Sequence, residues 1–163
     1  MFKEGLLEGK RILVTGGGTG LGKEMSRYFL KYGAEVIICG RRGEVLQKTA
    51  NLLMEEEGGS VKFYPLDIRA PQDVDNLIDE IFQEGALDGL VNNAAGNFIS
   101  RTQDLSHRGF DAIASIVFHG TFYVTHSVAK RWLEKNLKGS VISILATWVW
   151  TGSAFVVPSA MSK

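Results

Sequence analysis

The stretch from Thr15 to Gly22, TGGGTGLG, decides the fold of this 163-residue chain. It follows the apolar run Arg11–Thr15 (RILVT), whose length and branched residues are typical of a buried β-strand. It precedes an amphipathic segment that predicts a helix over residues 21–32. The sequence therefore predicts a strand, a glycine-rich turn and a helix in direct succession.

The glycines of this turn, Gly16, Gly20 and Gly22, have the spacing G-x-x-x-G-x-G. Glycine is needed where φ is positive and where a side chain would collide with a pyrophosphate. The helix that begins near Leu21 offers free N–H groups and its positive dipole end to such a group, and Thr19 lies in the same turn. A glycine-rich turn without a ligand is the alternative, but the flanking strand and helix favour a nucleotide-binding turn.

The rest of the chain alternates short apolar segments with longer amphipathic ones. We expect further strands at 35–39, 61–66, 87–92 and 140–145, and helices at 43–57, 71–84 and 106–136, the last broken near His119 and Gly120. This pattern predicts one α/β domain over residues 1–163, a doubly wound parallel sheet of Rossmann type in three layers, αβα. Because Lys163 falls where another helix should start, we expect a piece of a longer chain that lacks the C-terminal strands.

Composition narrows the range of functions. The 18 basic and 18 acidic residues give a net charge of zero, which argues against a nucleic-acid or membrane-surface role. A net charge of zero is nevertheless compatible with a local basic patch. The single Cys39 excludes an internal disulfide framework and fits a reducing compartment, and without a hydrophobic leader or spanning segment we expect a cytoplasmic protein. His107 and His126 have no metal-ligand spacing with a second ligand, so we expect no metal.

The end of the second strand indicates the cofactor. An NAD site needs Asp or Glu there to hold the ribose 2′-hydroxyl, whereas this chain has Gly40, Arg41 and Arg42. Guanidinium groups suit a 2′-phosphate through charge-assisted, bidentate hydrogen bonds. The alternative is a solvated basic pair at a helix start, but the pattern favours NADPH.

Two later motifs carry a family resemblance. The segments 92–100 (NNAAGNFIS) and 151–163 (TGSAFVVPSAMSK), read with the glycine turn, resemble the short-chain dehydrogenase/reductase family, and most closely its 2,4-dienoyl-CoA reductases. The resemblance spans essentially the whole chain. It implies NADPH-dependent reduction of an unsaturated fatty acyl-CoA.

The resemblance also assigns cofactor contacts. It implies that Asp67 meets the adenine amino group, that Asn92, Asn93 and Gly96 lie beside the adenosine ribose and nicotinamide, and that Lys163 holds the nicotinamide ribose. Alternatively, Asp67 caps a turn, the asparagines satisfy a strand end and Lys163 faces solvent. We expect the cofactor to contact Gly16, Thr19, Gly20, Leu21, Gly22, Arg41, Arg42, Asp67, Ile68, Asn93, Ala94, Gly96 and Lys163.

The catalytic positions depart from the common family pattern. Ser159, four residues before Lys163, stands where most of the family has tyrosine, as in the dienoyl-CoA subfamily, and Ala146 replaces the family's serine. The subfamily's two thioester-oxygen donors, asparagine and tyrosine, correspond to His119 and Trp148. Imidazole and indole N–H groups can donate, but a packed helix histidine and an apolar pocket wall are the alternatives. We expect catalytic residues Lys163, Ser159 and His119, and substrate contacts from Asn97, Phe98 and Trp148.

The leading hypothesis is therefore an NADPH-dependent oxidoreductase that acts on an acyl-CoA, a 2,4-dienoyl thioester. A carbonyl or 3-oxoacyl reductase is a rival, weakened because Ser159 lacks the acidity of a tyrosine. A non-catalytic NADP-binding homologue is a second rival. If the chain is longer in the cell, the resemblance implies a homo-oligomer paired through long helices, and residues 112–133 carry enough apolar side chains for at least one buried face.

Overall fold

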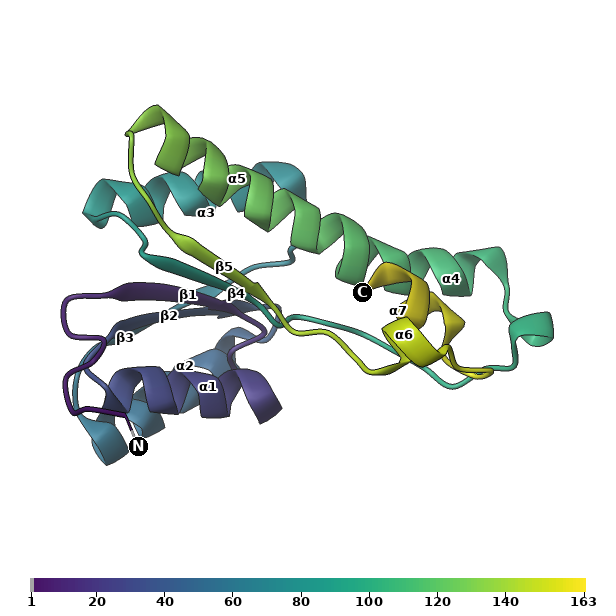
Figure 1. The fold of residues 1–163 in the computed structure, drawn as a ribbon, viewed down its shortest axis with the longest axis horizontal. Helices are drawn as coiled ribbons and strands as arrows, with labels where there is room; N and C mark the ends of the chain where they lie inside the picture. Colours follow the sequence, from purple (N-terminus) through teal and green to yellow (C-terminus); the bar gives the residue numbers. More distant parts are fainter. Residues whose placement is uncertain (1) are drawn as a thin grey trace.

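The computed structural model describes residues 2–163 and contains one five-stranded parallel sheet (Figure 1). Its strands are β1 (Arg11–Thr15), β2 (Glu35–Gly40), β3 (Val61–Pro65), β4 (Gly89–Asn92) and β5 (Ser140–Ser143). Their spatial order is β3-β2-β1-β4-β5, and every neighbouring pair is parallel. Strands β2 and β3 thus lie on one side of β1, and β4 and β5 lie on the other. This order confirms the doubly wound sheet and places its switch point between β1 and β4.

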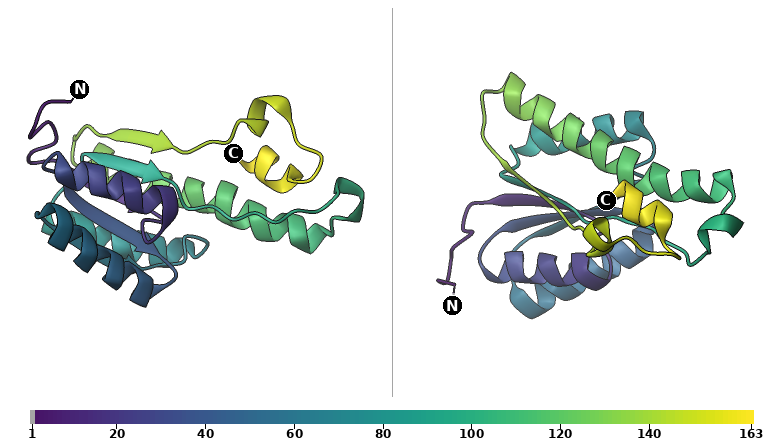
Figure 2. Two further views of the ribbon diagram at one scale, coloured as in Figure 1. Left: turned by 90° about the horizontal axis from the view of Figure 1, so that it is seen from below. Right: turned by 45° about the vertical axis from the view of Figure 1, so that its right-hand side comes forward.

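Helices cover both faces of the sheet (Figures 1 and 2). The helices α1 (Gly20–Lys31) and α2 (Gly43–Glu57) pack on one face, while α3 (Pro71–Glu84) and α5 (Thr121–Glu134) pack on the other. The remaining elements are short: a 3₁₀ turn η1 (Thr102–Asp104), α4 (His107–Ala114), α6 (Trp148–Thr151) and α7 (Val157–Ser162). Figure 1 shows α4, α6 and α7 grouped beyond the carboxyl ends of the strands.

Strict alternation along the central strands divides the core between the two layers. Leu13 and Ile37 face α3 and α5, whereas Val14, Val36 and Ile38 face α1 and α2, and all are at most 1% exposed. Successive side chains of a strand point to opposite faces of the sheet, and helices cover both faces of a central parallel strand. Consecutive residues must therefore all be apolar. The same burial raises the pKa of the Cys39 thiol to about 12, so this thiol stays protonated and unreactive.

The long helical segment after η1 is distorted rather than broken. A π-helical turn, η2 (Ser115–Gly120), joins α4 to α5, so the predicted break at His119–Gly120 is wrong. A Cβ at Gly120 would lie 2.7 Å from the side chain of Ile68. The glycine therefore serves close packing against the loop after β3, and the wider turn accommodates it without ending the helix.

The last part of the chain differs most from expectation. The sequence predicts a helix starting at Lys163, but α7 already begins at Val157, and α6 was not predicted. β5 is shorter than predicted and lies at the sheet edge, where Val141 and Ile142 are 43% and 53% exposed. Side-chain alternation identifies this strand but does not reveal that its faces lie open.

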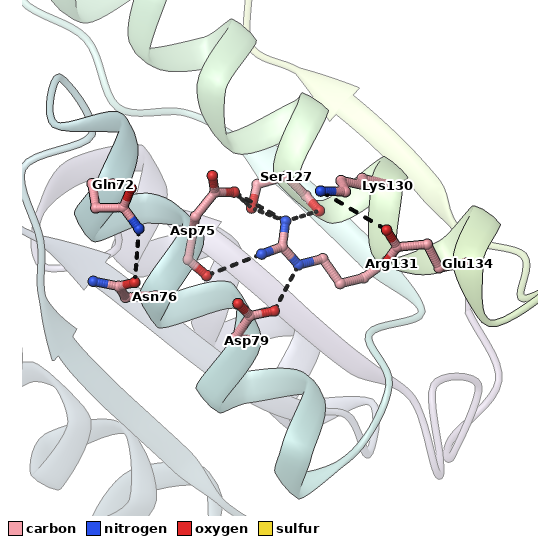
Figure 3. A network of polar contacts seen from close by, with 8 residues as sticks. All are labelled: Gln72, Asp75, Asn76, Asp79, Ser127, Lys130, Arg131 and Glu134. Carbon is pink, nitrogen blue, oxygen red and sulfur yellow. Dashed lines mark hydrogen bonds and ion pairs between the residues drawn. The ribbon is translucent and has the colours of Figure 1, made fainter.

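A buried guanidinium ties α5 to α3 (Figure 3). Arg131, only 7% exposed, donates to the carboxylates of Asp75 at 3.0 Å and Asp79 at 2.9 Å, and to the Ser127 hydroxyl at 2.9 Å. Ser127 in turn donates to Asp75 at 2.6 Å. The Ser127 hydroxyl and then the Arg131 guanidinium lower the pKa of Asp75, while Arg131 is the main cause of the lowered pKa of Asp79.

Replacing Arg131 with methionine should destabilise the fold. The substitution keeps an apolar stem but leaves both aspartates without their cation; because these carboxylates are half exposed and can rehydrate, we expect a loss of about 2 kcal/mol, less than for a fully buried pair. Urea unfolding measures the loss. Lys130→Met removes a 3.9 Å surface pair with Glu134 and the smallest of the charge contributions that lower the pKa of Asp75 and Asp79; it is the control and should change stability by less than about 0.5 kcal/mol. Equal effects of the two variants would contradict a special role for Arg131.

The same network should make stability fall in acid. The folded-state pKa values of Asp75 and Asp79 lie below their unfolded values, so their contribution is complete above about pH 4 and is lost as pH falls through the folded values. We expect the free energy of unfolding to decrease below about pH 4, and to decrease less in Arg131→Met. Urea titrations at several acidic pH values test this, and parallel pH profiles for both proteins would refute it.

Candidate functional site

The largest group of predicted site residues meets at the carboxyl ends of β1, β2 and β4. A cavity of about 280 Å³ opens there, next to the switch point of the sheet. Its walls are Gly16, Gly18, Thr19, Gly40, Arg41, Arg42, Val45, Leu46, Leu66, Asp67, Ile68, Asn93, Ala94, Ala95 and Ile116. Ligands of doubly wound sheets bind in this position, because strand ends and helix N-termini converge there.

At Gly22 the glycine turn leaves no room for a side chain. A Cβ at Gly22 would lie 2.3 Å from the carbonyl oxygen of Gly16 and 2.6 Å from the amide nitrogen of Asn93. Gly16 and Gly20 have φ of +68° and +56°, and the Cβ position of Gly20 has no atom within 4 Å. The first turn of α1 has neither a side-chain cap nor an acidic residue, so its N–H groups and dipole are available to an anion. The turn therefore fits a pyrophosphate.

Thr15 holds this turn against the loop after β4, a role that the sequence analysis missed. Its hydroxyl is 1% exposed and accepts hydrogen bonds from the backbone N–H groups of Asn93 and Ala94, both at 3.0 Å. The side chain of Asn93 donates back to the carbonyl oxygens of Thr15 and Gly16 at 3.0 and 3.2 Å. Asn93 thus hydrogen-bonds the backbone carbonyl groups at the end of β1, which is the alternative role considered for it. It also lines the cavity. The signal available in the sequence was a hydroxyl at the last position of the strand.

Arg41 and Arg42 carry the positive charge of the cavity. Both are exposed, and Arg42 Nη2 lies 3.5 Å from Thr19 Oγ1. Among residues 2–163, neither arginine forms an ion pair with a carboxylate. Their charges are therefore unneutralised, as a site for a phosphate monoester requires.

Asp67 lines the same cavity, and its carboxylate is held from behind by Arg69. Arg69 Nε lies 2.9 and 3.0 Å from the two carboxylate oxygens, and the backbone N–H of Arg69 donates to Oδ1 at 3.1 Å. These hydrogen bonds lower the pKa of Asp67, with a smaller contribution from the charge of Arg41. Asp67 therefore stabilises a local turn and remains ionised beside Arg41; Ile68, which follows it, is buried.

Some predicted cofactor residues lie outside the cavity wall. These are Gly20, Leu21, Gly22, Gly96 and Lys163. Leu21 is 67% exposed at the first turn of α1, and Gly96 packs near Ile116. Lys163 Nζ donates to the carbonyl oxygen of Ile144 at 2.6 Å, and burial lowers its pKa. Lys163 is thus tied to the end of β5 rather than turned to solvent.

Asn92 ends β4 as a buried polar group. It is 5% exposed, and its amide nitrogen donates to Thr125 Oγ1 at 2.8 Å. Its side-chain oxygen has no hydrogen-bond partner among the described residues. Its backbone oxygen accepts from Ile144 N at 2.9 Å, which connects Asn92 to the segment that holds Lys163.

The predicted catalytic and substrate residues do not gather in one cavity as most of the predicted cofactor residues do. Ser159 is 3% exposed on α7, whereas His119 is exposed on η2, so the alternative of a packed helix histidine is wrong. His119 borders a second hollow of about 390 Å³, together with Phe118, Met161 and Ser162. None of the predicted catalytic residues lines the first cavity.

The residues expected to contact substrate lie on the loops after β4 and β5. Asn97 and Phe98 are exposed, and Phe98 lies close to Gly109 of α4. Trp148, at the start of α6, is half-buried, and its indole N–H is buried without a partner among the described residues. An indole N–H can only donate, so Trp148 has a free donor as well as an apolar ring.

Neither a metal cluster nor a spanning helix is found in the described part of the chain. Within residues 2–163, no three His, Cys, Asp or Glu side chains gather as metal ligands. No helix over the same residues is long and apolar enough to cross a membrane.

Comparison with known proteins gives consistent relatives. The chain is 42% identical over its whole length to a Caenorhabditis elegans protein named probable 2,4-dienoyl-CoA reductase 3, covering 53% of it. It is 35% identical over 96% of its length to a Bacillus subtilis protein named probable 2,4-dienoyl-CoA reductase, covering 62% of it. The chain thus spans a little over half the length of these curated relatives. A relative from Arabidopsis thaliana, 36% identical over 99% of this chain and matched over 57% of its own length, is named a peroxisomal 2,4-dienoyl-CoA reductase, so a cytoplasmic location stays a prediction.

The fold has close counterparts among solved structures. A short chain dehydrogenase from Bacillus anthracis superimposes with a TM-score of 0.90 at 38% identity, over 94% of this chain and 62% of that one. Residues 10–163 also match the family described as short chain dehydrogenase, which is nearly the whole chain. The chain belongs to the short chain dehydrogenase family.

Proposed function

We propose that this chain is an NADP-binding domain of an oxidoreductase that reduces 2,4-dienoyl-CoA thioesters. The observation that carries the proposal is the cavity in which an uncapped glycine turn meets two unpaired arginines. Relatives named 2,4-dienoyl-CoA reductases support the substrate class. Strands β1 to β4 and the helices α1, α2, α3 and α5 contribute to two core clusters on the two faces of one sheet, which supports a single domain.

Different residues of the cavity would bind different parts of the cofactor. The backbone of the glycine turn and the start of α1 would hold the pyrophosphate, and Arg41 and Arg42 would bind the 2′-phosphate. Asp67 would accept a hydrogen bond from the adenine amino group. Lys163 would hold the nicotinamide ribose from its position on the carbonyl oxygen of Ile144.

When bound, NADPH supplies the hydride that reduces the conjugated diene. The residues of the chain must then stabilise the negative charge that develops on the thioester oxygen and deliver a proton. Trp148 offers a buried, unpaired N–H donor, and His119 offers an exposed imidazole that can donate in either protonation state. Ser159 would assist with its hydroxyl. Each donor stabilises this charge only when it lies about 3 Å from the oxygen.

A second candidate function is nucleotide binding without catalysis. It is favoured by one observation: His119, Ser159 and Trp148 do not line the cavity that holds the predicted cofactor residues. The two functions share the same cofactor site, so only turnover separates them.

NADPH should stabilise the protein more than NADH does. Cofactor at one hundred times its dissociation constant adds about 2.7 kcal/mol to the free energy of unfolding, because it binds only the folded state. At equal concentrations we expect the larger shift with NADPH, measured by thermal or urea unfolding. In the double variant Arg41→Gln/Arg42→Gln the two cofactors should give equal shifts, whereas Lys48→Gln, an exposed lysine on α2, should keep the difference. A larger shift with NADH in the native protein would refute the cofactor assignment.

Turnover should require a dienoyl thioester. We expect the absorbance of NADPH to fall when a 2,4-dienoyl-CoA is added, but not when a 3-oxoacyl-CoA or a simple ketone is added. Trp148→Phe keeps the ring and removes the N–H; if the indole serves as an oxyanion donor, kcat should fall about 100-fold. An unchanged kcat would make Trp148 an apolar wall. Tight NADPH binding with no turnover of any of the three substrates would favour the non-catalytic function instead.

A further inference from the structure

Arg69 does not line the cavity, whereas Asp67, two residues before it, does. Three of its donors reach the Asp67 carboxylate: the backbone N–H at 3.1 Å, Nε at 2.9 and 3.0 Å, and Nη2 at 2.5 Å. These contacts engage both carboxylate oxygens, two on each, with Nε shared between them.

The carboxylate of Asp67 presents an electrostatic conflict in this cavity. It shares the wall with Arg41 and Arg42, and left alone it would offset part of their positive charge. A phosphate monoester carries a charge of about −1.5 to −2 at neutral pH, so a nearby bare carboxylate would repel it. NADH has no 2′-phosphate. An uncompensated Asp67 would therefore weaken the binding of NADPH more than that of NADH.

We propose that Arg69 is a positioning residue that sets cofactor specificity by compensating the charge of Asp67. Its guanidinium keeps the carboxylate in place for the adenine while cancelling its charge toward the 2′-phosphate. The proposal rests on the proposed function, because it assumes that a dinucleotide occupies this cavity.

A purely structural role for Arg69 does not account for its contacts. The turn is already closed by the backbone bond from Ala70 N to the Asp67 carbonyl oxygen at 3.0 Å, and by Arg69 N to the carboxylate. The Arg69 side chain is 42% exposed, and Asp67 is its sole ion-pair partner within residues 2–163. Exposed pairs of this kind contribute little to stability. The turn itself therefore does not depend on the guanidinium, which leaves its charge for the electrostatic role proposed above.

The test is the ratio of NADPH affinity to NADH affinity, measured by titration of cofactor fluorescence. Arg69→Gln should lower this ratio roughly three- to tenfold, because one compensating charge is lost at the edge of a partly exposed site. In Asp67→Asn/Arg69→Gln the ratio should recover, since the repelling carboxylate is gone as well. Arg69→Lys should keep most of the ratio because it keeps the charge. Arg101→Gln, which breaks an exposed pair with Asp104 elsewhere, is the matched control and should leave the ratio unchanged.

The prediction concerns how the substitution changes the ratio of NADPH affinity to NADH affinity. The experiment therefore gives a result whichever cofactor the native protein prefers. A native protein without NADPH preference would overturn the cofactor assignment, and Arg69→Gln would still have to shift the ratio toward NADH. An equal loss for both cofactors, or a lowered ratio that persists in the double variant, would overturn the role of Arg69. The shift should also shrink at high salt, which a structural defect would not do. Circular dichroism confirms that each variant is folded.

Discussion

The site depends on one close contact, in which the carboxyl end of β1 meets the loop that follows β4. The Thr15 hydroxyl receives two backbone N–H groups from that loop, and Asn93 returns two hydrogen bonds to the turn after β1. Gly22 has no space for a Cβ beside these bonds, and a Cβ at Gly16 would lie 3.0 Å from both Ala94 Cα and the Asn93 amide nitrogen. Because β1 and β4 are neighbours at the switch point, this contact fixes where α1 begins and therefore where its free N–H groups point.

Charge is arranged locally although the chain has no net charge. The buried Arg131 lies between α3 and α5 and binds two carboxylates, so its charge stabilises the fold. Arg41 and Arg42 have no such partners and remain available at the cavity. The pair of Asp67 and Arg69 lies between these extremes, since its carboxylate faces the cavity and its cation does not. Overall composition argued against nucleic acid as a partner but could not reveal this division.

Local sequence patterns predicted most of the framework, and tertiary contacts explain what they missed. β1, α2 and α3 have the predicted bounds because apolar periodicity, glycine and a first-turn proline act within a few residues. The π-helical turn η2 was missed because it depends on the approach of Gly120 to Ile68, fifty-two residues earlier in the chain. The roles of Thr15 and Arg131 were missed for the same reason. Eight of the predicted cofactor residues line one cavity, whereas the catalytic positions, assigned through resemblance, depend on how separate loops pack.

The two halves of the candidate site are therefore constrained differently. The cofactor half is built on the ends of strands whose side chains are almost fully buried, so the turn, Arg41 and Asp67 are placed by the core itself. The substrate half is carried by the loops after β4 and β5, where Phe98 is exposed, and by α7, which packs on α4 rather than on the sheet. His119 and Trp148, which are proposed hydrogen-bond donors of that half, belong to neither core cluster. The catalytic function and the non-catalytic function proposed for this chain therefore differ only in the substrate half, and both use the same fold and the same candidate nucleotide site.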